Sequence, residues 1–349
     1  MKKQLCFAVV LLGMLAASLG MAPAADAKTR KVRLQLDWVI MGYHAGFFVA
    51  KDKGFYKSKG LEVSIGRGYG SGDTAKVVAS GASEFGLMSV PTQIISRGKG
   101  APVVTISAVM SKAPESFLSF EEKGIKSIKD VEGKTFAEAP GSAMLVEWPA
   151  FTKLVGLDPS KIKLISIEPA AKGAVFFSGK VDFVAGWRPG FDEPIILRAR
   201  KEGKKLRFIR WEDHGWKVYG SGLGTSVKLL KSDPKLVRDF VSASMDGYAY
   251  MISHPKEALN IVMKNNPEMS RDTTWLSLLF GIDGVATANA KKNGLGWLEP
   301  DRMKFMIDTM SSLLKFAPPK PQDMYTNQFI TKKAYTISPE LKKELANLP

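Results

Sequence analysis

The sequence predicts an α/β protein of two lobes, each built on a mostly parallel sheet flanked by helices, with a cleft between the lobes. Three observations support this prediction. The chain has 349 residues, more than one hydrophobic core usually accommodates. From Lys31 onward, short apolar runs typical of strands alternate with segments typical of helices. A similar local pattern then occurs again near the middle of the chain, as two lobes of one design would produce.

The first 27 residues have the features of a secretory signal peptide. Lys2 and Lys3 form a basic start, an apolar run covers residues 6–19, and Ala25-Asp26-Ala27 offers small residues at a cleavage site. We therefore expect cleavage after Ala27 and a periplasmic protein. An uncleaved membrane anchor is the alternative, which the shortness of the run disfavours. The single cysteine, Cys6, lies in this segment, so we expect no disulfide, thiol nucleophile or cysteine metal ligand in the mature chain.

The strongly basic composition does not indicate a nucleic-acid partner. The formal net charge is +16, but the lysines are scattered and have acids between many of them. A basic stripe interleaved with aromatic residues, as nucleic-acid-binding proteins show, does not occur in the sequence. Export argues against such a partner as well.

The expected elements fall into two series. In the first, strands are predicted over 32–36, 61–65, 85–89 and 103–109, with helices over 46–59 and 73–80. In the second, strands are predicted over 135–138, 162–167, 183–187 and 206–211, with helices over 143–155 and 170–177. After Gly220-Ser221-Gly222 the chain is expected to be mostly helical, over 234–265 and 273–280.

An internal similarity connects the two series. Ser80-Gly81 corresponds to Ser178-Gly179, and Glu84-Phe85 corresponds to Asp182-Phe183. In both places a helix ends at a glycine, where a left-handed backbone is favoured, and a short buried strand follows. One interpretation is two similar lobes that present the strand ends at Ser89 and Trp187 to a shared cleft. The other is that any helix–glycine–strand unit has this pattern.

Several segments resemble the NMT1/THI5-like family, which comprises solute-binding proteins of ABC importers and their relatives. They are LDW at 36–38, His44-Ala45-Gly46, VAKDKGFYKSKGLEV at 49–63, GSGDTAKVVASG, SEFGLMS, IKSIKDVEGKTFA and GSAMLVE. The resemblance covers roughly residues 30–260. It implies a type II periplasmic-binding fold, with residues 28–112 and 219–349 in lobe one, residues 113–218 in lobe two, and crossings near 110–114 and 218–222. The family includes binders of pyrimidine precursors of thiamine, sulfonates, nitrate and riboflavin.

The end of the first strand supplies the first candidate ligand-binding residues. Ligands of open α/β sheets bind beyond the carboxyl ends of the strands, which here points to Asp37 and Trp38. An indole can stack on a flat heterocycle, or it can close the core of a lobe. The resemblance implies that the LDW segment lines the pocket. Tyr43 and His44 follow. His44 is interpreted as a hydrogen-bonding residue near the ligand, or as a histidine satisfied by local backbone.

The other candidates lie at later strand ends and at two helix starts. Ser71 and Ser142 begin helices, where free backbone N–H groups can bind a ligand oxygen, although simple capping also explains them. Trp187 could stack opposite Trp38, and Ser89 could orient the ligand. Glu193 could accept hydrogen bonds from a ligand amine, or begin a helix before Pro194. Arg188 could instead pair with a carboxylate or sulfonate.

Catalytic patterns are absent from the sequence. It has no Gly-x-Ser-x-Gly elbow and no HExxH motif, and its three histidines are far apart. We therefore expect no enzyme activity, cofactor or metal site. The related eukaryotic enzymes carry a cysteine-rich motif that this chain lacks after Cys6. A thiamine-pyrimidine synthase on the same fold remains the alternative, as does a sensor lobe.

We expect a periplasmic solute-binding protein that closes on a small ligand and delivers it to an ABC permease. A pyrimidine-type N-heterocycle is the favoured ligand, with sulfonate, nitrate or another small organic anion as the alternative. The protein is expected to act as a monomer.

Overall fold

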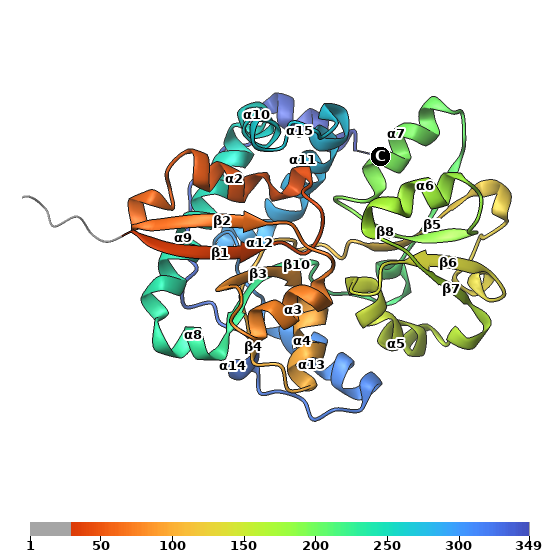
Figure 1. Ribbon diagram of the computed structural model, residues 1–349, viewed down its shortest axis with the longest axis horizontal. Helices are drawn as coiled ribbons and strands as arrows, with labels where there is room; N and C mark the ends of the chain where they lie inside the picture. The colour runs from red at the N-terminus through yellow and green to blue at the C-terminus, as the bar shows by residue number, and fades with distance from the viewer. Residues whose placement is uncertain (1–28, 349) are drawn as a thin grey trace, which may run out of the picture.

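The computed structural model describes residues 29–348, which form two lobes around two five-stranded sheets (Figure 1). The predicted signal peptide lies outside the described residues. Lobe one contains the sheet β2-β1-β3-β10-β4, with bounds Leu61–Gly66, Arg30–Gln35, Phe85–Ser89, Ser221–Ser226 and Val103–Ala108. Lobe two contains β7-β6-β8-β5-β9, with bounds Lys163–Ser166, Thr135–Glu138, Phe183–Trp187, Glu115–Phe120 and Leu206–Arg210. The chain passes between the sheets twice, within 109–114 and 211–220.

The two sheets have the same design, which confirms the predicted fold class. In each sheet the central strand, β3 or β8, pairs in parallel with one neighbour and antiparallel with the other. The antiparallel strand is β10 in lobe one and β5 in lobe two, and each is the first strand after a crossing. Four strands of each sheet therefore run in one direction, and the strand that first enters the lobe after a crossing runs against them.

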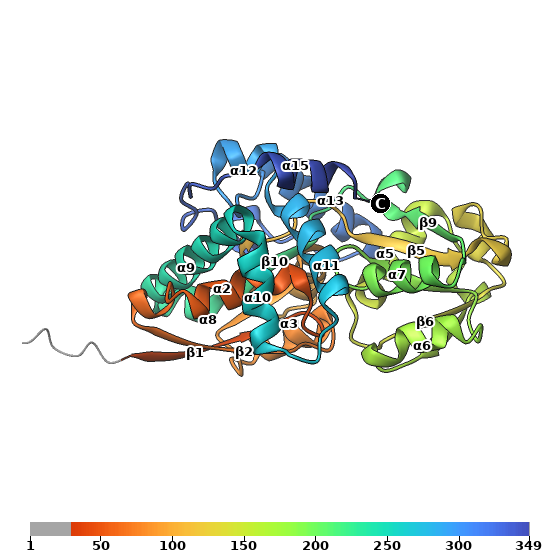
Figure 2. The same ribbon diagram turned by 90° about the horizontal axis from the view of Figure 1, so that it is seen from above.

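Helices cover both lobes. The helices of the first part are α2 (Ala45–Asp52), α3 (Ser71–Ala79), α4 (Val90–Gly98), α5 (Ala143–Val155), α6 (Lys172–Phe177) and α7 (Asp192–Lys201). The later ones are α8 (Val227–Ser232), α9 (Pro234–Ser253), α10 (Pro255–Asn265), α11 (Arg271–Val285), α12 (Ala288–Asn293), α13 (Pro300–Leu314), α14 (Pro321–Met324) and α15 (Pro339–Ala346). Both views place α5, α6 and α7 in lobe two, and α2, α9 and α10 in lobe one (Figure 2).

Some expected elements differ from those observed, for local reasons. The predicted helix 46–59 ends at Asp52, and only a short 3-10 turn, Lys57–Lys59, follows. The predicted helix 234–265 is two helices, because Pro255 interrupts it after His254. Strand β10 was not expected, since its sequence SGLGTS contains two glycines and lacks a strand pattern.

The internal similarity reflects corresponding units of the two sheets. Glu84 accepts a hydrogen bond from the backbone N–H of Arg33 on β1, at 2.8 Å. In lobe two, Asp182 accepts one from the backbone N–H of Thr135 on β6, at 2.9 Å. The preceding glycines, Gly81 and Gly179, have φ angles of +78° and +73°. The repeated glycine and acid therefore have the same role in both lobes, ending a helix and tying the next strand to its neighbour.

Lobe one has a large aromatic contact at the centre of its core. The ring of Phe240 on α9 stacks on Phe85 of β3, with 3.8 Å between centroids, and Tyr56 stacks against Phe240 at 5.4 Å. All three side chains are buried. The long helix α9 is therefore fixed on the sheet beneath the strand whose end leads to the cleft.

Replacement of Phe240 by alanine should lower the free energy of unfolding by about 3–5 kcal/mol, because it opens a cavity in a closely packed core. Urea unfolding followed by circular dichroism measures this change. Phe305→Ala is the matched control, because the Phe305 side chain on α13 is 44% exposed, and it should cost less than about 1 kcal/mol. Equal effects of the two substitutions would contradict this view of the core.

Candidate functional site

A cavity lies between the lobes and is lined by both. Its free volume is about 40 Å³ in this arrangement of the lobes, well below the roughly 300–1,000 Å³ of typical small-molecule sites. Lobe one contributes Asp37, Trp38, Tyr43 and Ser71. Lobe two contributes Glu138, Ser142, Ala143, Met144, Lys172, Trp187, Gly190 and Phe191. Three large aromatic rings from opposite lobes, Trp38, Trp187 and Phe191, give it an apolar lining suited to a flat ligand.

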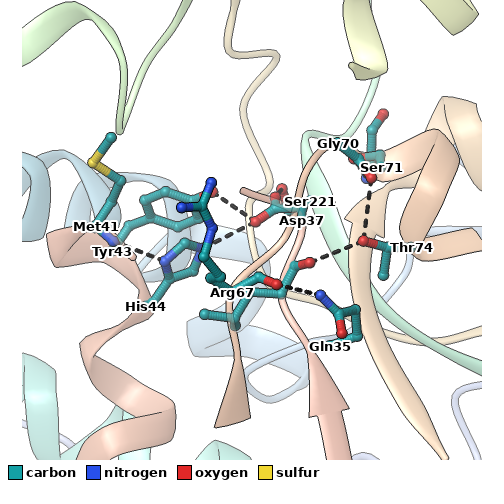
Figure 3. Close-up of polar contacts among 12 residues, drawn as sticks. Gln35, Asp37, Met41, Tyr43, His44, Arg67, Gly70, Ser71, Thr74 and Ser221 are labelled. Carbon is teal, nitrogen blue, oxygen red and sulfur yellow. Dashed lines mark hydrogen bonds and ion pairs between the residues drawn. The ribbon is translucent and has the colours of Figure 1, made fainter. Parts of the chain in front are cut away.

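The carboxylate of Asp37 forms the polar wall on the side of lobe one (Figure 3). Its Oδ1 accepts hydrogen bonds from the Tyr43 hydroxyl at 2.9 Å and from His44 Nε2 at 3.0 Å. Its Oδ2 accepts one from the Ser221 hydroxyl at 2.8 Å. Asp37 follows β1, Tyr43 and His44 precede α2, and Ser221 begins β10. The carboxylate therefore joins three separate segments of the chain.

The hydrogen bonds of His44 determine its tautomer. The backbone N–H of Met41 donates to Nδ1 at 3.0 Å, so the proton of a neutral ring must lie on Nε2, where it is donated to Asp37. His44 is fully buried and its ring packs on Tyr43 at 3.9 Å. Burial, followed by the nearby Asp37 carboxylate, raises the pKa of Tyr43 well above its ordinary value, so its hydroxyl stays protonated and donating.

A buried ion pair forms the wall on the side of lobe two. Lys172 Nζ on α6 donates to Glu138 Oε2 at 2.5 Å, and Glu138 Oε1 accepts from the backbone N–H of Ala139 at 2.8 Å. The ammonium lies 4.1 Å from the centre of the Phe191 ring and 6.0 Å from that of Trp38. The cation therefore sits next to aromatic rings from both lobes.

Two helix starts meet at the edge of the cavity. The backbone N–H of Gly72 on α3 donates to the carbonyl oxygen of Gly141 at 3.1 Å, which joins lobe one to lobe two. A side chain at Gly70, whose φ is +137°, would come within 2.0 Å of the same carbonyl oxygen. Ser142 caps α5 by accepting from the N–H of Leu145. The lobes can approach this closely only because glycines face each other here.

Six of the ten residues predicted from the sequence line this cavity together: Asp37, Trp38, Tyr43, Ser71, Ser142 and Trp187. His44 lies behind Asp37 and Tyr43. Ser89 is buried outside the cavity, where its backbone N–H donates to Ser71 Oγ at 2.9 Å and its hydroxyl donates to Glu147. His44 and Ser89 therefore do not line the cavity themselves but hydrogen-bond to residues that do.

Glu193 and Arg188 lie away from the lining. Glu193 is buried and accepts from the backbone N–H of Gly190 at 2.7 Å, and burial followed by nearby Asp192 raises its pKa to about 8. The Arg188 guanidinium faces a separate hollow, where it lies 4.5 Å from the Phe280 ring and 3.9 Å from Asp192. Neither side chain lines the cavity, and the ligand-binding roles expected for them from the sequence stay predictions.

A known family matches the larger part of the chain. The model of the family described as NMT1/THI5 like matches residues 41–258. The chain belongs to the NMT1/THI5-like family. The formylaminopyrimidine-binding protein of Halalkalibacterium halodurans is 27% identical over 70% of this chain and 73% of the relative. A 4-amino-5-hydroxymethyl-2-methylpyrimidine phosphate synthase of Legionella pneumophila is 24% identical over 70% and 77%, and the riboflavin-binding protein RibY of Chloroflexus aurantiacus is 24% identical over 90% of both chains.

Solved structures confirm the two-lobed fold of this NMT1/THI5-like protein. The periplasmic aliphatic sulphonate-binding protein SsuA of Escherichia coli superposes with a TM-score of 0.62 at 15% identity, over 88% of this chain and 96% of that one. SsuA of Xanthomonas axonopodis, bound to MOPS, gives 0.62 at 15% identity over 84% and 96%. Between residues 29 and 348, no helix is long and apolar enough to cross a membrane. Over the same residues, no group of three or more His, Cys, Asp or Glu side chains is arranged to hold a metal ion.

Reasoning from the sequence did not identify three residues that line the cavity, namely Glu138, Lys172 and Phe191. The end of the predicted strand 135–138 is Glu138, so the rule that led to Asp37 would also have found Glu138. Phe191 lies just beyond the strand end at Trp187. Lys172 stands inside a predicted helix among many other lysines, and nothing in its local sequence distinguishes it.

A pair of buried carboxyl groups, Glu147 and Glu115, lies at the lobe junction. Glu147 on α5 accepts hydrogen bonds from the hydroxyls of Ser89 and Thr92 on lobe one, the latter at 2.8 Å. Burial raises its pKa to about 7, although these hydroxyls act in the opposite direction. Burial, and then the neighbouring Glu147, raises the pKa of Glu115 well above its ordinary value. Trp216 also faces Glu115 and lowers that pKa. Burial at the contact between the lobes therefore favours the protonated forms of Glu115 and Glu147.

Glu147→Gln should make thermal stability less dependent on pH. The native pKa of Glu147 is raised, so its folded state keeps a proton that the unfolded chain has released. Stability is therefore fully present below the ordinary glutamate pKa and declines as pH rises through about 7. Differential scanning calorimetry should show little change in Tm for the variant at pH 5 and a higher Tm than the wild type at pH 8.5.

The glutamine of this variant keeps a carbonyl oxygen for the Ser89 and Thr92 hydroxyls, so the substitution removes the charge but not the acceptor. Glu122→Gln, at an exposed position, is the control and should follow the wild type at every pH. Parallel pH profiles for Glu147→Gln and wild type would show that Glu147 is not protonated in the native protein.

Proposed function

We propose that this protein is the periplasmic solute-binding component of an ABC importer, and that it binds a small flat ligand in the cavity between its lobes. The observation that carries the proposal is a cavity whose aromatic rings come from both lobes. Trp38 belongs to lobe one, whereas Trp187 and Phe191 belong to lobe two. A ligand that fits between these rings would contact both lobes and would favour the arrangement in which the lobes are close.

Hinge closure around the ligand is the proposed mechanism. The lobes share an apolar core beside the crossings, where Ile94 and Met306 pack in one cluster with Phe151 and Trp211 of lobe two. The contacts at the cavity edge include a hydrogen bond between the lobes, from the N–H of Gly72 to the carbonyl oxygen of Gly141. We infer that the lobes turn about the shared core and the two crossings, while the edge contacts form and break. The closed form would then dock, as a monomer, on a membrane permease.

A pyrimidine-type N-heterocycle is the proposed ligand. The aromatic lining supports a ring, and a relative of this chain is named for binding formylaminopyrimidine. A sulfonate, nitrate or other small organic anion is the second candidate, because structural neighbours include sulphonate-binding proteins. The position of Arg188 outside the cavity weighs against the anion, since the strongest fixed cation predicted from the sequence does not face the ligand.

We propose binding rather than catalysis. Relatives include a pyrimidine phosphate synthase. The resemblance implies that, in the related eukaryotic enzymes, a histidine at the position similar to His44 takes part in the chemistry as a substrate donor. Here His44 is fully buried behind Asp37 and Tyr43 and does not line the cavity. The chain also has no cysteine after Cys6. After incubation with iron, the peptide containing His44 should keep its mass, and a modified peptide would overturn this part of the proposal.

A thermal-shift screen tests the proposed function. The panel holds aminopyrimidines, flavins, aromatic acids, sulfonates and nitrate, and a ligand at 100 times its Kd should stabilise the protein by about 2.7 kcal/mol. Trp38→Ala should abolish the ligand-induced shift, because it removes the ring that lobe one contributes.

Trp275→Ala is the matched control, since Trp275 lies on α11 away from the cavity and hydrogen-bonds to Glu344. It should leave the ligand-induced shift intact even if its basal Tm falls. A shift that survives Trp38→Ala would place the ligand elsewhere, and a panel without any hit would refute the proposed ligand classes.

A further inference from the structure

The cavity has an imbalance between hydrogen-bond donors and acceptors. On the acceptor side, both oxygens of Asp37 and both oxygens of Glu138 already accept at least one hydrogen bond from the protein. These are the two carboxylates that line the cavity within the described residues. Each of these four oxygens therefore already has a hydrogen-bond partner within the protein, although a carboxylate oxygen can accept a second hydrogen bond.

The donor side is less well satisfied. Lys172 is 3% exposed and has three N–H groups, yet among residues 29–348 its hydrogen-bond acceptor is Glu138 alone. The indole Nε1–H of Trp187 is buried without a hydrogen-bond partner in the same part of the chain. A buried donor without an acceptor costs free energy, and a buried indole N–H usually finds a partner. Both side chains line the cavity and both belong to lobe two.

We infer that Lys172 and Trp187 select the ligand by its hydrogen-bond acceptors, so that the bound ring carries a carbonyl oxygen on the edge that faces lobe two. This inference rests on the proposed function, because it concerns the same cavity. Glu138 is a positioning residue that holds the Lys172 ammonium. Phe191 packs against the ammonium at 4.1 Å and keeps it beside the cavity.

Charge favours a neutral carbonyl over a carboxylate. The ionisable side chains that line the cavity are Asp37, Glu138 and Lys172, together with the Tyr43 phenol, whose pKa is raised. Two carboxylates against one ammonium leave an excess of one negative charge. A second anion from the ligand would add to that excess, whereas a ring carbonyl supplies the acceptor without a charge. An amino group at the same position would place a donor against a donor.

Two ring compounds of the same shape test this inference by isothermal titration calorimetry. Lumazine, which is pteridine-2,4-dione, presents carbonyl oxygens where 2,4-diaminopteridine presents amino groups. The wild-type protein should bind lumazine at least tenfold more tightly than the diamine. Lys172→Met should reduce this preference to less than threefold, and Lys172→Arg should retain most of it. Trp187→Phe keeps an aromatic ring, removes the N–H and should also weaken lumazine binding severalfold.

Controls separate selectivity from folding. Lys172→Met leaves Glu138 buried without its cation, so the double variant Lys172→Met/Glu138→Gln removes both charges and should show the same loss of preference. Lys123→Met breaks a different ion pair of lobe two, between Lys123 and Asp182 at 3.3 Å and away from the cavity, and should keep the full preference.

Equal or reversed affinities in the wild type would overturn the inference, as would a preference that persists in the double variant. Failure of both pteridines to bind would also overturn it. The proposed function fails separately, when no compound of the wider panel stabilises the protein.

Discussion

The structure of the cleft depends on the buried carboxylate of Asp37. A carboxylate removed from water costs several kcal/mol unless donors surround it, so its position is fixed by where those donors lie. Here the donors come from Tyr43, His44 and Ser221. Ser221 begins the strand that returns from lobe two. The same group therefore fixes the end of β1, the start of the first helix and one of the two crossings, and it does so in the wall of the cavity.

The donors of Asp37 are themselves held by the helices of lobe one. The hydroxyl of Tyr248 on α9 donates to the carbonyl oxygen of Tyr43 at 3.2 Å, and the N–H of Tyr43 donates to Ser277 on α11 at 3.3 Å. A side chain at Gly42 would collide with the backbone of α11 near Thr274. The C-terminal helices thus position a tyrosine more than 200 residues earlier in the chain. The donors of Asp37 are therefore fixed by contacts within lobe one, and the proposed closure would change only the contacts between the lobes.

The sequence predicted the fold well because its strands and glycine-ended helices are local patterns. The repeated acid and glycine in each lobe pointed to the shared design of the sheets. The strand-end rule led to Asp37, Trp38 and Trp187, which line the cavity. The strand-end rule does not say on which side of the sheet a residue lies. Adjacent side chains of a strand point in opposite directions, and Arg188 lies on the other side from Trp187. Nor did the rule find Lys172, whose partner Glu138 is 34 residues away in the sequence. Pairings over such distances depend on tertiary packing.

The central claim is that ligand binding brings the two lobes together around this cavity. The distance between spin labels on the lobes tests it most directly. In a Cys6→Ser background, cysteines introduced at the exposed positions Lys76 in lobe one and Lys180 in lobe two can be labelled specifically. Pulsed electron spin resonance should give a broad distance distribution without ligand. A saturating ligand should replace it with a single, shorter distance. An identical distribution in both conditions would contradict closure and would leave the cavity as a fixed feature of a rigid protein.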